Sequence, residues 1–393
     1  GVPAIPRLAA ALGFADPRIR LCGVNGLGLV GDPGREFLAG ACNDPDPVVR
    51  DRARELLGIS KDAQKTAPER EITGAAAGIP VEKPPQGKPS LSPADIQENI
   101  RLISHPNKDI QIQAVTAIVQ AGESAVIPLV DALISEKNEI RAGAAEALVE
   151  IGEPSVMPLV KALSVSPADA RVWILHALGK LGNRQAVGEI SRFLDDADPR
   201  VRLAATEALG YIGDPLISGR LVKILTDPDD QIRASAVRAL GYIGDPTSVP
   251  ALVTALGDEE YRVREMAQEA LFEIGTPAIP VLVDALKSRF HEVREGAAES
   301  LEQLGWKPGT TNETAYFLMA QESWMDLARM GDDAIPPLSN ALDTTDDDLR
   351  LGVVLTLGRM AGAETIGLLA RVLTDKNVMI RQKATMALVD MGT

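Results

Sequence analysis

The segment VRLAATEALGYIGDP, Val201–Pro215, is followed thirty-one residues later by IRASAVRALGYIGDP, Ile232–Pro246. A near-identical repeat at this spacing is typical of proteins that stack one small unit many times. Apolar residues recur at intervals of three and four in both copies, so they share one face of an α-helix. The Gly-Asp-Pro that ends each copy is a helix-stop signal. Together the two copies predict a helical solenoid.

Further copies of this pattern run along the whole chain. Each is anchored on a hydrophobic residue followed by arginine and is closed by glycine, once by alanine, twelve residues after the hydrophobic position. Two weaker copies fit the same register, since Val49-Arg50 lacks the closing glycine and Ile110-Gln111 carries glutamine in place of arginine. The eleven copies contain ten arginines: Arg20, Arg50, Arg141, Arg171, Arg202, Arg233, Arg264, Arg294, Arg350 and Arg381.

A second, shorter apolar segment precedes most copies, such as IPLVDAL from Ile127 and IPVLVDAL from Ile279. Proline near the start of a helix forfeits only an N–H group that has no intrahelical partner. The repeating unit is therefore predicted to be helix, turn, helix. The prolines predicted to mark the starts of first helices are Pro128, Pro158, Pro250, Pro280 and Pro336.

The run PLVxAL followed by D-P-x-V-R-x-x-A-A-x-A-L-G-x-I-G resembles the HEAT repeat in its short prokaryotic form, the bilin-lyase-like (PBS lyase HEAT-like) class. The resemblance covers nearly the whole chain. It implies an all-α fold, a right-handed α-α superhelix of eleven helix pairs plus one degenerate pair. It also implies that the second helix of each pair lines the concave face. The signatures of tetratricopeptide, ankyrin and leucine-rich repeats do not occur in the sequence.

Two interruptions divide the array. Residues 60–92 are rich in Pro, Gly, Ala and Lys and predict a linker, either a tolerated surface insertion or a regulated arm. Residues 306–331 widen the spacing from Arg294 to Arg350 to 56 residues and predict two short helices. The expected organisation is two repeats over 1–59, the linker over 60–92, seven repeats over 93–305, the degenerate pair over 306–331 and two repeats over 332–393.

Composition narrows the range of partners and locations. Lys+Arg 40 against Asp+Glu 55 gives a net charge of −15, which repels polyanions, so we expect no nucleic-acid partner. No stretch approaches the ~20 apolar residues of a membrane-spanning helix. Cys22 and Cys42 lack metal-ligand spacing and favour a reducing compartment. We expect a cytoplasmic location, with an upstream signal left open because the chain starts at Gly1 and not at Met.

Residues that catalyse reactions or bind metals are sparse. The three histidines, His105, His176 and His291, lie in different repeats, and His291-Glu292 is the one His-Glu pair. The HEAT-like enzyme deoxyhypusine hydroxylase holds two irons with several such pairs, so this chain lacks the ligands for that site. No phosphate-binding loop, nucleophile-elbow or zinc-protease motif occurs. We therefore expect no enzyme activity and no cofactor.

The family resemblance gives the repeated arginine a structural role. It implies that each arginine pairs with an acidic residue in the turn of the neighbouring repeat. Such a ladder would fix the rotation between repeats, and a role in binding is the alternative. The candidate acceptors in the turns are Asp16, Asp46, Asp198, Asp229, Asp258 and Asp375.

The register places acidic and apolar side chains together on the concave face. Large apolar groups among charges are typical of binding anchors with a polar rim, whereas a merely solvated face is the alternative for the charges. A basic peptide with apolar anchors would satisfy both features. The candidate partner-binding residues are Trp173, His176, Leu203, Glu207, Arg238, Tyr261, Glu265, Met266, Glu269, Glu295 and Glu299.

The C-terminal repeats place apolar residues at positions that the register leaves exposed: Leu351, Leu355, Met379 and Met386. Terminal repeats of a finished solenoid normally carry a polar cap. We expect either a partner at this end, including a second copy of the chain, or a native stack that continues past Thr393.

These observations favour a non-enzymatic scaffold that binds a protein or peptide partner on its concave surface. One alternative is a HEAT-repeat subunit of, or accessory to, an enzyme whose catalytic group is supplied elsewhere. Another is a purely structural array that assembles with itself.

Overall fold

The computed structural model describes residues 91–360 and 362–392 and, nearer the N-terminus, residues 12, 20, 21, 24, 27, 35–42, 44 and 46–57. These residues belong to two compact units, Gly1–Pro84 and Pro85–Thr393. The predicted linker over 60–92 lies outside the described residues as far as residue 90.

The first unit contains a helix pair, α3 (Arg35–Ala41) and α4 (Pro47–Leu57). It has its own small core, which includes Leu38 and Val49. Asp46 caps α4, accepting a hydrogen bond from the backbone N–H of Val48 at 2.8 Å.

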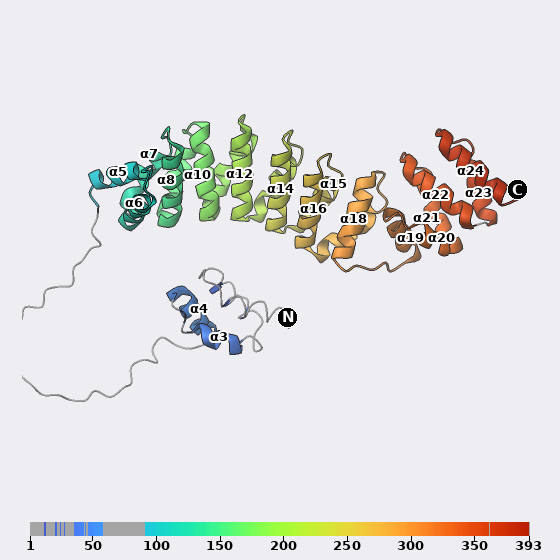
Figure 1. Ribbon diagram of the computed structural model, residues 1–393, viewed down its shortest axis with the longest axis horizontal. Coiled ribbons are helices and arrows are strands. Elements are labelled where there is room, and N and C mark those ends of the chain that lie inside the picture. The colour runs from blue at the N-terminus through green and yellow to red at the C-terminus, as the bar shows by residue number, and fades with distance from the viewer. Residues whose placement is uncertain are drawn as a thin grey trace, which may run out of the picture. The chain divides into compact units, whose positions relative to one another are not determined.

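The second unit is a row of helix pairs that follow one another in chain order (Figure 1). The described residues form helices and turns without a β-strand, which confirms the all-α repeat superhelix. The α-helices are α5 (Pro93–Leu102), α6 (Lys108–Ala121), α7 (Glu123–Ala132), α8 (Asn138–Ile151), α9 (Val156–Leu163), α10 (Ala168–Leu181), α11 (Val187–Ile190), α12 (Pro199–Ile212), α13 (Ser218–Ile224), α14 (Asp230–Ile243), α15 (Val249–Ala255), α16 (Tyr261–Ile274), α17 (Ile279–Ala285), α18 (His291–Gln303), α19 (Thr311–Ala320), α20 (Trp324–Arg329), α21 (Ile335–Ala341), α22 (Asp347–Met360), α23 (Ala363–Val372) and α24 (Val378–Asp390).

The repeated Asp and Gly set the ends of the second helices. Asp198 precedes α12 and accepts a hydrogen bond from the backbone N–H of Arg200 at 2.9 Å, which caps the helix. Gly213, with φ of 66°, ends α12 in the left-handed conformation that glycine adopts without strain. Asp229 and Gly244 do the same for α14. In these two repeats the recurring Asp and Gly therefore set where the second helix begins and ends.

The prolines of the first helices follow the prediction only in part. Pro250, Pro280 and Pro336 lie in the first turn of α15, α17 and α21. Pro128, in contrast, lies inside α7, so the predicted start at this residue is wrong. The cause is that α7 already begins at Glu123, where other repeats form a separate short 3-10 turn.

Glycines inside the second helices let neighbouring repeats approach closely. A Cβ on Gly179 would lie 2.7 Å from the Cα of Ala208, and one on Gly210 would lie 2.7 Å from the Cβ of Ala239. These distances are too short for any side chain, so hydrogen is required here. At the equivalent places, α8 carries Val149 and α16 carries Phe272. The second helices therefore cannot all pack equally closely.

Buried arginine–aspartate pairs also join successive repeats. The Arg233 guanidinium donates to both carboxylate oxygens of Asp258, at 2.9 and 2.8 Å, and Arg202 does the same with Asp227. Such two-pronged, charge-assisted hydrogen bonds are the strong ones. Among the described residues, six arginines pair with an aspartate of a following repeat, Arg294 doing so across the insertion: Arg20 with Asp44, Arg171 with Asp196, Arg202 with Asp227, Arg233 with Asp258, Arg294 with Asp346 and Arg350 with Asp375.

Several of the predicted acceptors are wrong. Asp46, Asp198 and Asp229 cap their own helices, and the pairing residue is the aspartate two positions earlier in each turn. In these three turns the capping aspartate accepts from its own helix, and the earlier aspartate reaches the arginine of the preceding repeat. Asp346 does both, since it caps α22 by accepting from the backbone N–H groups of Asp348 and Leu349 and also pairs with Arg294. The predicted acceptors Asp258 and Asp375 do pair with arginines, whereas Asp16 lies outside the described residues.

Five of the six pairing aspartates, all but Asp346, connect two arginines. The carboxylate of Asp227 accepts from Arg202 of the preceding repeat, and its backbone carbonyl accepts from Nη1 of Arg233 at 3.0 Å. Asp258 links Arg233 to Arg264 in the same way. We call this alternating chain of contacts the arginine–aspartate ladder. It runs through the interior, since the Arg233 side chain is only 8% exposed.

Three predicted members of the ladder, Arg141, Arg264 and Arg381, have no carboxylate partner within the described part of the chain, and each donates to a backbone carbonyl of its own repeat. Arg381 belongs to the last described repeat, whereas Arg141 and Arg264 interrupt the ladder. The turns that follow them carry Ser166 and Ser288 where other turns carry aspartate. Their helices, α8 and α16, also lack the close-approach glycine, as do α6 with Val119 and α18 with Glu302. Both connections are therefore missing at the α8–α10 and α16–α18 joints.

The ladder makes Arg233→Ala a sensitive test. Its removal leaves Asp258 buried without its partner, and we expect a loss of about 3–5 kcal/mol in the free energy of unfolding. The matched control is Arg264→Ala, which removes an equivalent arginine with no carboxylate partner, and there we expect about 1 kcal/mol. Urea denaturation followed by circular dichroism measures both. Equal losses would show that the carboxylate contact is not what stabilises the stack.

The ladder also predicts loss of stability in acid. Burial by itself raises the pKa of Asp258, but hydrogen bonds from Arg233 and from a backbone N–H outweigh it, so the pKa lies below the ordinary 3.8. A carboxyl with a lowered pKa stabilises the fold above its unfolded pKa, and the stabilisation is lost as the pH falls through the folded pKa. At neutral pH, Tm should be higher for the wild type than for Asp258→Asn. The difference should shrink below about pH 3.8, and a difference that is constant with pH would contradict this account.

Candidate functional site

The exposed side of the second helices α10, α12, α14, α16 and α18 carries three hollows. We call this side the second-helix face. An aromatic hollow of about 290 Å³ lies between α10 and α12, and a central hollow of about 70 Å³ spans α12, α14 and α16. An acidic hollow of about 310 Å³ lies between α18 and α19. Glu207 lines both the aromatic and the central hollow, so these two adjoin.

Trp173 and His176 form one wall of the aromatic hollow, with their rings edge to face and the centroids 6.3 Å apart. His176 is exposed, whereas Trp173 is half-buried and packs partly against the core. Burial, assisted by the charge of Lys180, lowers the pKa of His176, which favours the neutral ring. Apart from Glu207, the hollow thus offers an uncharged surface with two aromatic rings in one wall.

The central hollow combines an ion pair with apolar groups. Arg238 Nη2 lies 3.2 Å from Glu207 Oε1 across α12 and α14, and both side chains are about one-third exposed. Leu203 and Met266 line the same hollow. An exposed pair of this kind contributes little to stability and can exchange partners. It can therefore rearrange when a charged ligand arrives.

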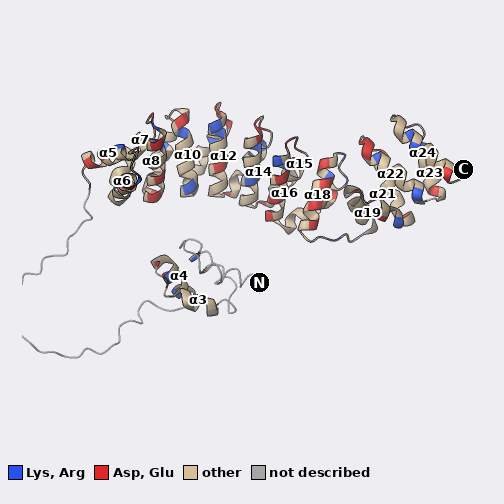
Figure 2. Ribbon diagram, viewed as in Figure 1, with Lys and Arg blue, Asp and Glu red and all other residues tan. Residues whose placement is uncertain are grey.

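The acidic hollow gathers carboxylates around a histidine. Glu295 and Glu299 of α18 line it, and His291 Nε2 lies 3.7 Å from Glu295 Oε2. Glu322, in the turn after α19, faces the other ring nitrogen at 3.9 Å. Figure 2 shows acidic residues concentrated on α16 and α18. A cationic group would be attracted to this end of the face.

The structure therefore brings together only part of the predicted site. Eight of its members line one of the three hollows, whereas Tyr261, Glu265 and Glu269 line none of them. Tyr261 is 67% exposed and its ring lies 5.6 Å from the Arg264 guanidinium. Glu265 and Glu269 are exposed on α16.

Sequence reasoning missed several lining residues. Tyr211 closes the aromatic hollow and is 59% exposed, yet its position near the end of α12 falls outside the register that we used. The repeated GYIGDP motif, which exposes Tyr242 similarly, was the available signal. Glu302 and Glu322 complete the acidic hollow. The second comes from the irregular insertion, to which no repeat register applies.

The C-terminal helices expose much of the predicted apolar set. Leu355, Met379 and Met386 are exposed, and Val389 of α24 joins them. Leu351 is half-buried against the neighbouring core, so its prediction as an exposed residue is only partly right.

Two properties of the described residues bear on other functions. No helix among them is long and apolar enough to cross a membrane. Within the same residues, no three His, Cys, Asp or Glu side chains gather in a way that could hold a metal ion. The cytoplasmic location stays a prediction.

Comparisons with known proteins agree with the repeat pattern. A family model described as HEAT repeats matches residues 97–172, 156–216, 219–302 and 320–393, more than half of the chain. No curated protein matches significantly. An engineered protein of known structure has 19% identity over 99% of both chains with a TM-score of 0.38. Human deoxyhypusine hydroxylase in complex with glycerol has 21% identity over 68% of this chain and 96% of its own, with a TM-score of 0.30. Similarities this low carry no argument, whereas the family match is decisive, and the chain belongs to the HEAT-repeat family.

Proposed function

We propose that the protein is a non-enzymatic scaffold that binds a protein or peptide partner on the second-helix face. The observation that carries this proposal is the row of hollows on one face, aromatic and apolar at α10–α16 and acidic at α18. Trp173, Leu203 and Met266 are large apolar groups that reach solvent among charges, as binding anchors do. The family supports the proposal because HEAT repeats commonly serve as interaction scaffolds.

The chemistry of the face favours a basic partner with apolar anchors. The apolar groups in the two adjoining hollows would supply most of the affinity, while the carboxylates near α18 would mainly speed association. We also propose that this face is concave, because the glycine contacts bring the second helices close together. The finer assignment to the short prokaryotic, bilin-lyase-like class is likewise proposed, on the motifs quoted above.

A random-peptide display library offers an unbiased test. Peptides selected on the wild type and counter-selected on Trp173→Ala should be rich in Lys or Arg and carry an aromatic or aliphatic residue. For such a peptide, Trp173→Ala should weaken binding by about 2 kcal/mol at any ionic strength. The pair Glu265→Gln and Glu269→Gln should slow association chiefly at low salt. Tyr242→Ala, an exposed aromatic residue on α14, serves as the control.

Because Trp173 packs partly on the core, its variant must retain the wild-type Tm for the comparison to count. Met266→Ala, in the central hollow, tests the same surface at a second place and must meet the same condition, because Met266 also packs partly on the core. The proposal fails if no selected peptide distinguishes the wild type from either variant. It also fails if the selected peptides are acidic.

We further propose that the apolar end of α24 mediates self-association. Met379 and Met386 are each at least half exposed there, and methionine-rich surfaces adapt well to partners. Light scattering should show a mass that rises with concentration, and Met379→Glu with Met386→Glu should abolish the rise. Met325→Glu, an equally exposed methionine on α20, should leave it unchanged. A constant monomer mass in the wild type would rule this out.

A further inference from the structure

The turn between α17 and α18, Lys287–Phe290, reverses the charge pattern of the turns before α12, α14, α16 and α22. Its sequence KSRF holds two basic residues and no acidic one. The corresponding turns before α12, α14, α16 and α22 each contain at least two acidic residues. In a chain with net charge −15, this reversal is a local exception. We call Lys287–Phe290 the basic turn.

The reversal has a structural cost. Ser288 stands where the preceding turn has Asp258, so Arg264 lacks the ladder partner that Arg202 and Arg233 have. A residue that breaks a local rule of the fold without a structural gain is a candidate for function.

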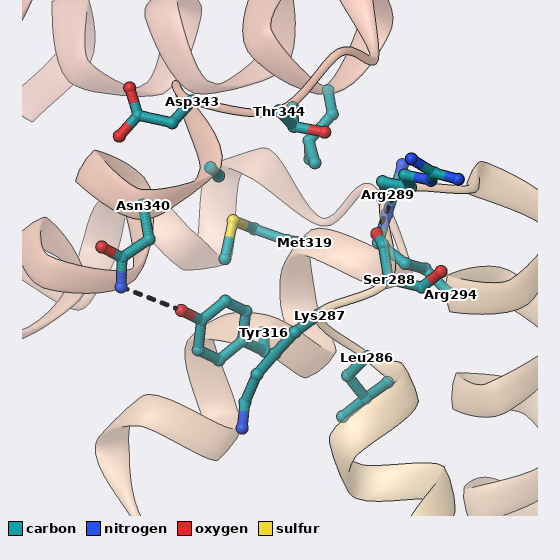
Figure 3. Close-up of a pocket in the computed structure, with 12 residues that line it drawn as sticks. Leu286, Lys287, Ser288, Arg289, Arg294, Tyr316, Met319, Asn340, Asp343 and Thr344 are labelled. Atoms are coloured by element: carbon teal, nitrogen blue, oxygen red, sulfur yellow. Dashed lines mark hydrogen bonds between the residues drawn. The ribbon is translucent and has the colours of Figure 1, made fainter. Parts of the chain in front are cut away.

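A cavity of about 280 Å³ opens on one side of the basic turn, as Figure 3 shows. Leu286 and Met319 supply apolar lining. The Lys287 side chain runs along Tyr316, with Nζ 5.8 Å from the ring centroid. Tyr316 itself is held by a 3.2 Å hydrogen bond from Asn340 Nδ2 to its hydroxyl. An aromatic ring thus holds a lysine at the rim of the cavity.

A second cavity, of about 500 Å³, lies on the other side of the turn. It shares Lys287 and Ser288 with the first, and Val253, Phe290 and Val293 supply its apolar lining. The basic turn therefore stands between two partly apolar cavities. An occupant that fills both must cross the turn.

The cations of the turn are available to a ligand. Arg289 has no carboxylate partner among the residues that the structure describes, and its guanidinium lies 4.6 Å from the ring centroid of Phe290. Lys287 contacts Asp284 at 3.1 Å, but both side chains are more than half exposed, so the pair is weak. Arg294, in contrast, is buried and neutralised by Asp346 at 2.6 Å.

We propose that the basic turn is a second docking site, which binds an acidic peptide segment of a protein partner. Carboxylates of the segment pair with Lys287 and Arg289, and apolar side chains on either side enter the two cavities. Two cavities separated by a charged turn fit an extended chain better than one compact small molecule. The net negative charge of the rest of the protein repels an acidic segment, whereas the basic turn attracts it, so the segment is directed to this site. This site is independent of the second-helix face and takes the opposite charge.

A fluorescein-labelled peptide of alternating Glu and Leu/Phe residues is the probe, and its Glu→Gln counterpart is the matched ligand control. Fluorescence anisotropy with the full chain at low salt should detect binding of the Glu peptide and little binding of the Gln peptide. Lys287→Gln with Arg289→Gln should weaken binding of the Glu peptide about tenfold or more. Lys223→Gln with Arg359→Gln makes the same change in net charge at exposed residues of α13 and α22 and should have little effect.

Three outcomes overturn the proposal. The Glu peptide does not bind, or both double variants weaken it equally, which indicates a general charge effect. In the third, citrate or inorganic phosphate binds in a Lys287- and Arg289-dependent manner while the peptide does not, which makes the turn a small-anion site. Because the double variant leaves the second-helix face intact, its effect is separable from the basic-peptide binding proposed above.

Discussion

The contact between an arginine of one repeat and an aspartate of the next is the constraint on which the order of the stack depends. Its two-pronged geometry admits one relative orientation of two charged groups, so each repeat is set at a defined rotation to its neighbour. The backbone carbonyl of the same aspartate holds the next arginine, as Asp227 does for Arg233, and passes the constraint along. Apolar contacts in the core stabilise the stack but are non-directional, whereas the ladder fixes the rotation between repeats.

This order creates the binding surface. Because the repeats hold a fixed register, equivalent positions of successive second helices fall side by side. Trp173 of one repeat and Glu207 of the next can then line the same hollow. None of these side chains forms a site within its own repeat. The surface is therefore a property of the stack, and its chemistry changes gradually along the row as exposed residues vary and the framework residues recur.

Much of the fold could be predicted from the sequence because helix start and stop signals recur along the chain, such as Asp198 and Gly213 around α12. The acceptors of the ladder could not be predicted, because many turns carry two acidic residues two positions apart and either could accept from the arginine. Only the backbone shows which of the two caps the helix. The site was predicted where the register holds. It was missed at Glu322, because the insertion follows no period and its turn is set by packing against α18.

The joints that lack both the glycine and the aspartate, which are α6–α8, α8–α10 and α16–α18, give the stack an uneven stiffness. At α8–α10 and α16–α18 neither the glycine contact nor the arginine–aspartate pair resists rotation of one repeat against the next. Bending of the stack is therefore expected at these joints, while the segment α10–α16 between them stays rigid. The α16–α18 joint lies between the central and the acidic hollow. Bending at this joint changes the distance between the apolar anchors and the carboxylates, so one rigid anchor region can bind partners of different length. A partner that binds on both sides of the joint restricts its bending.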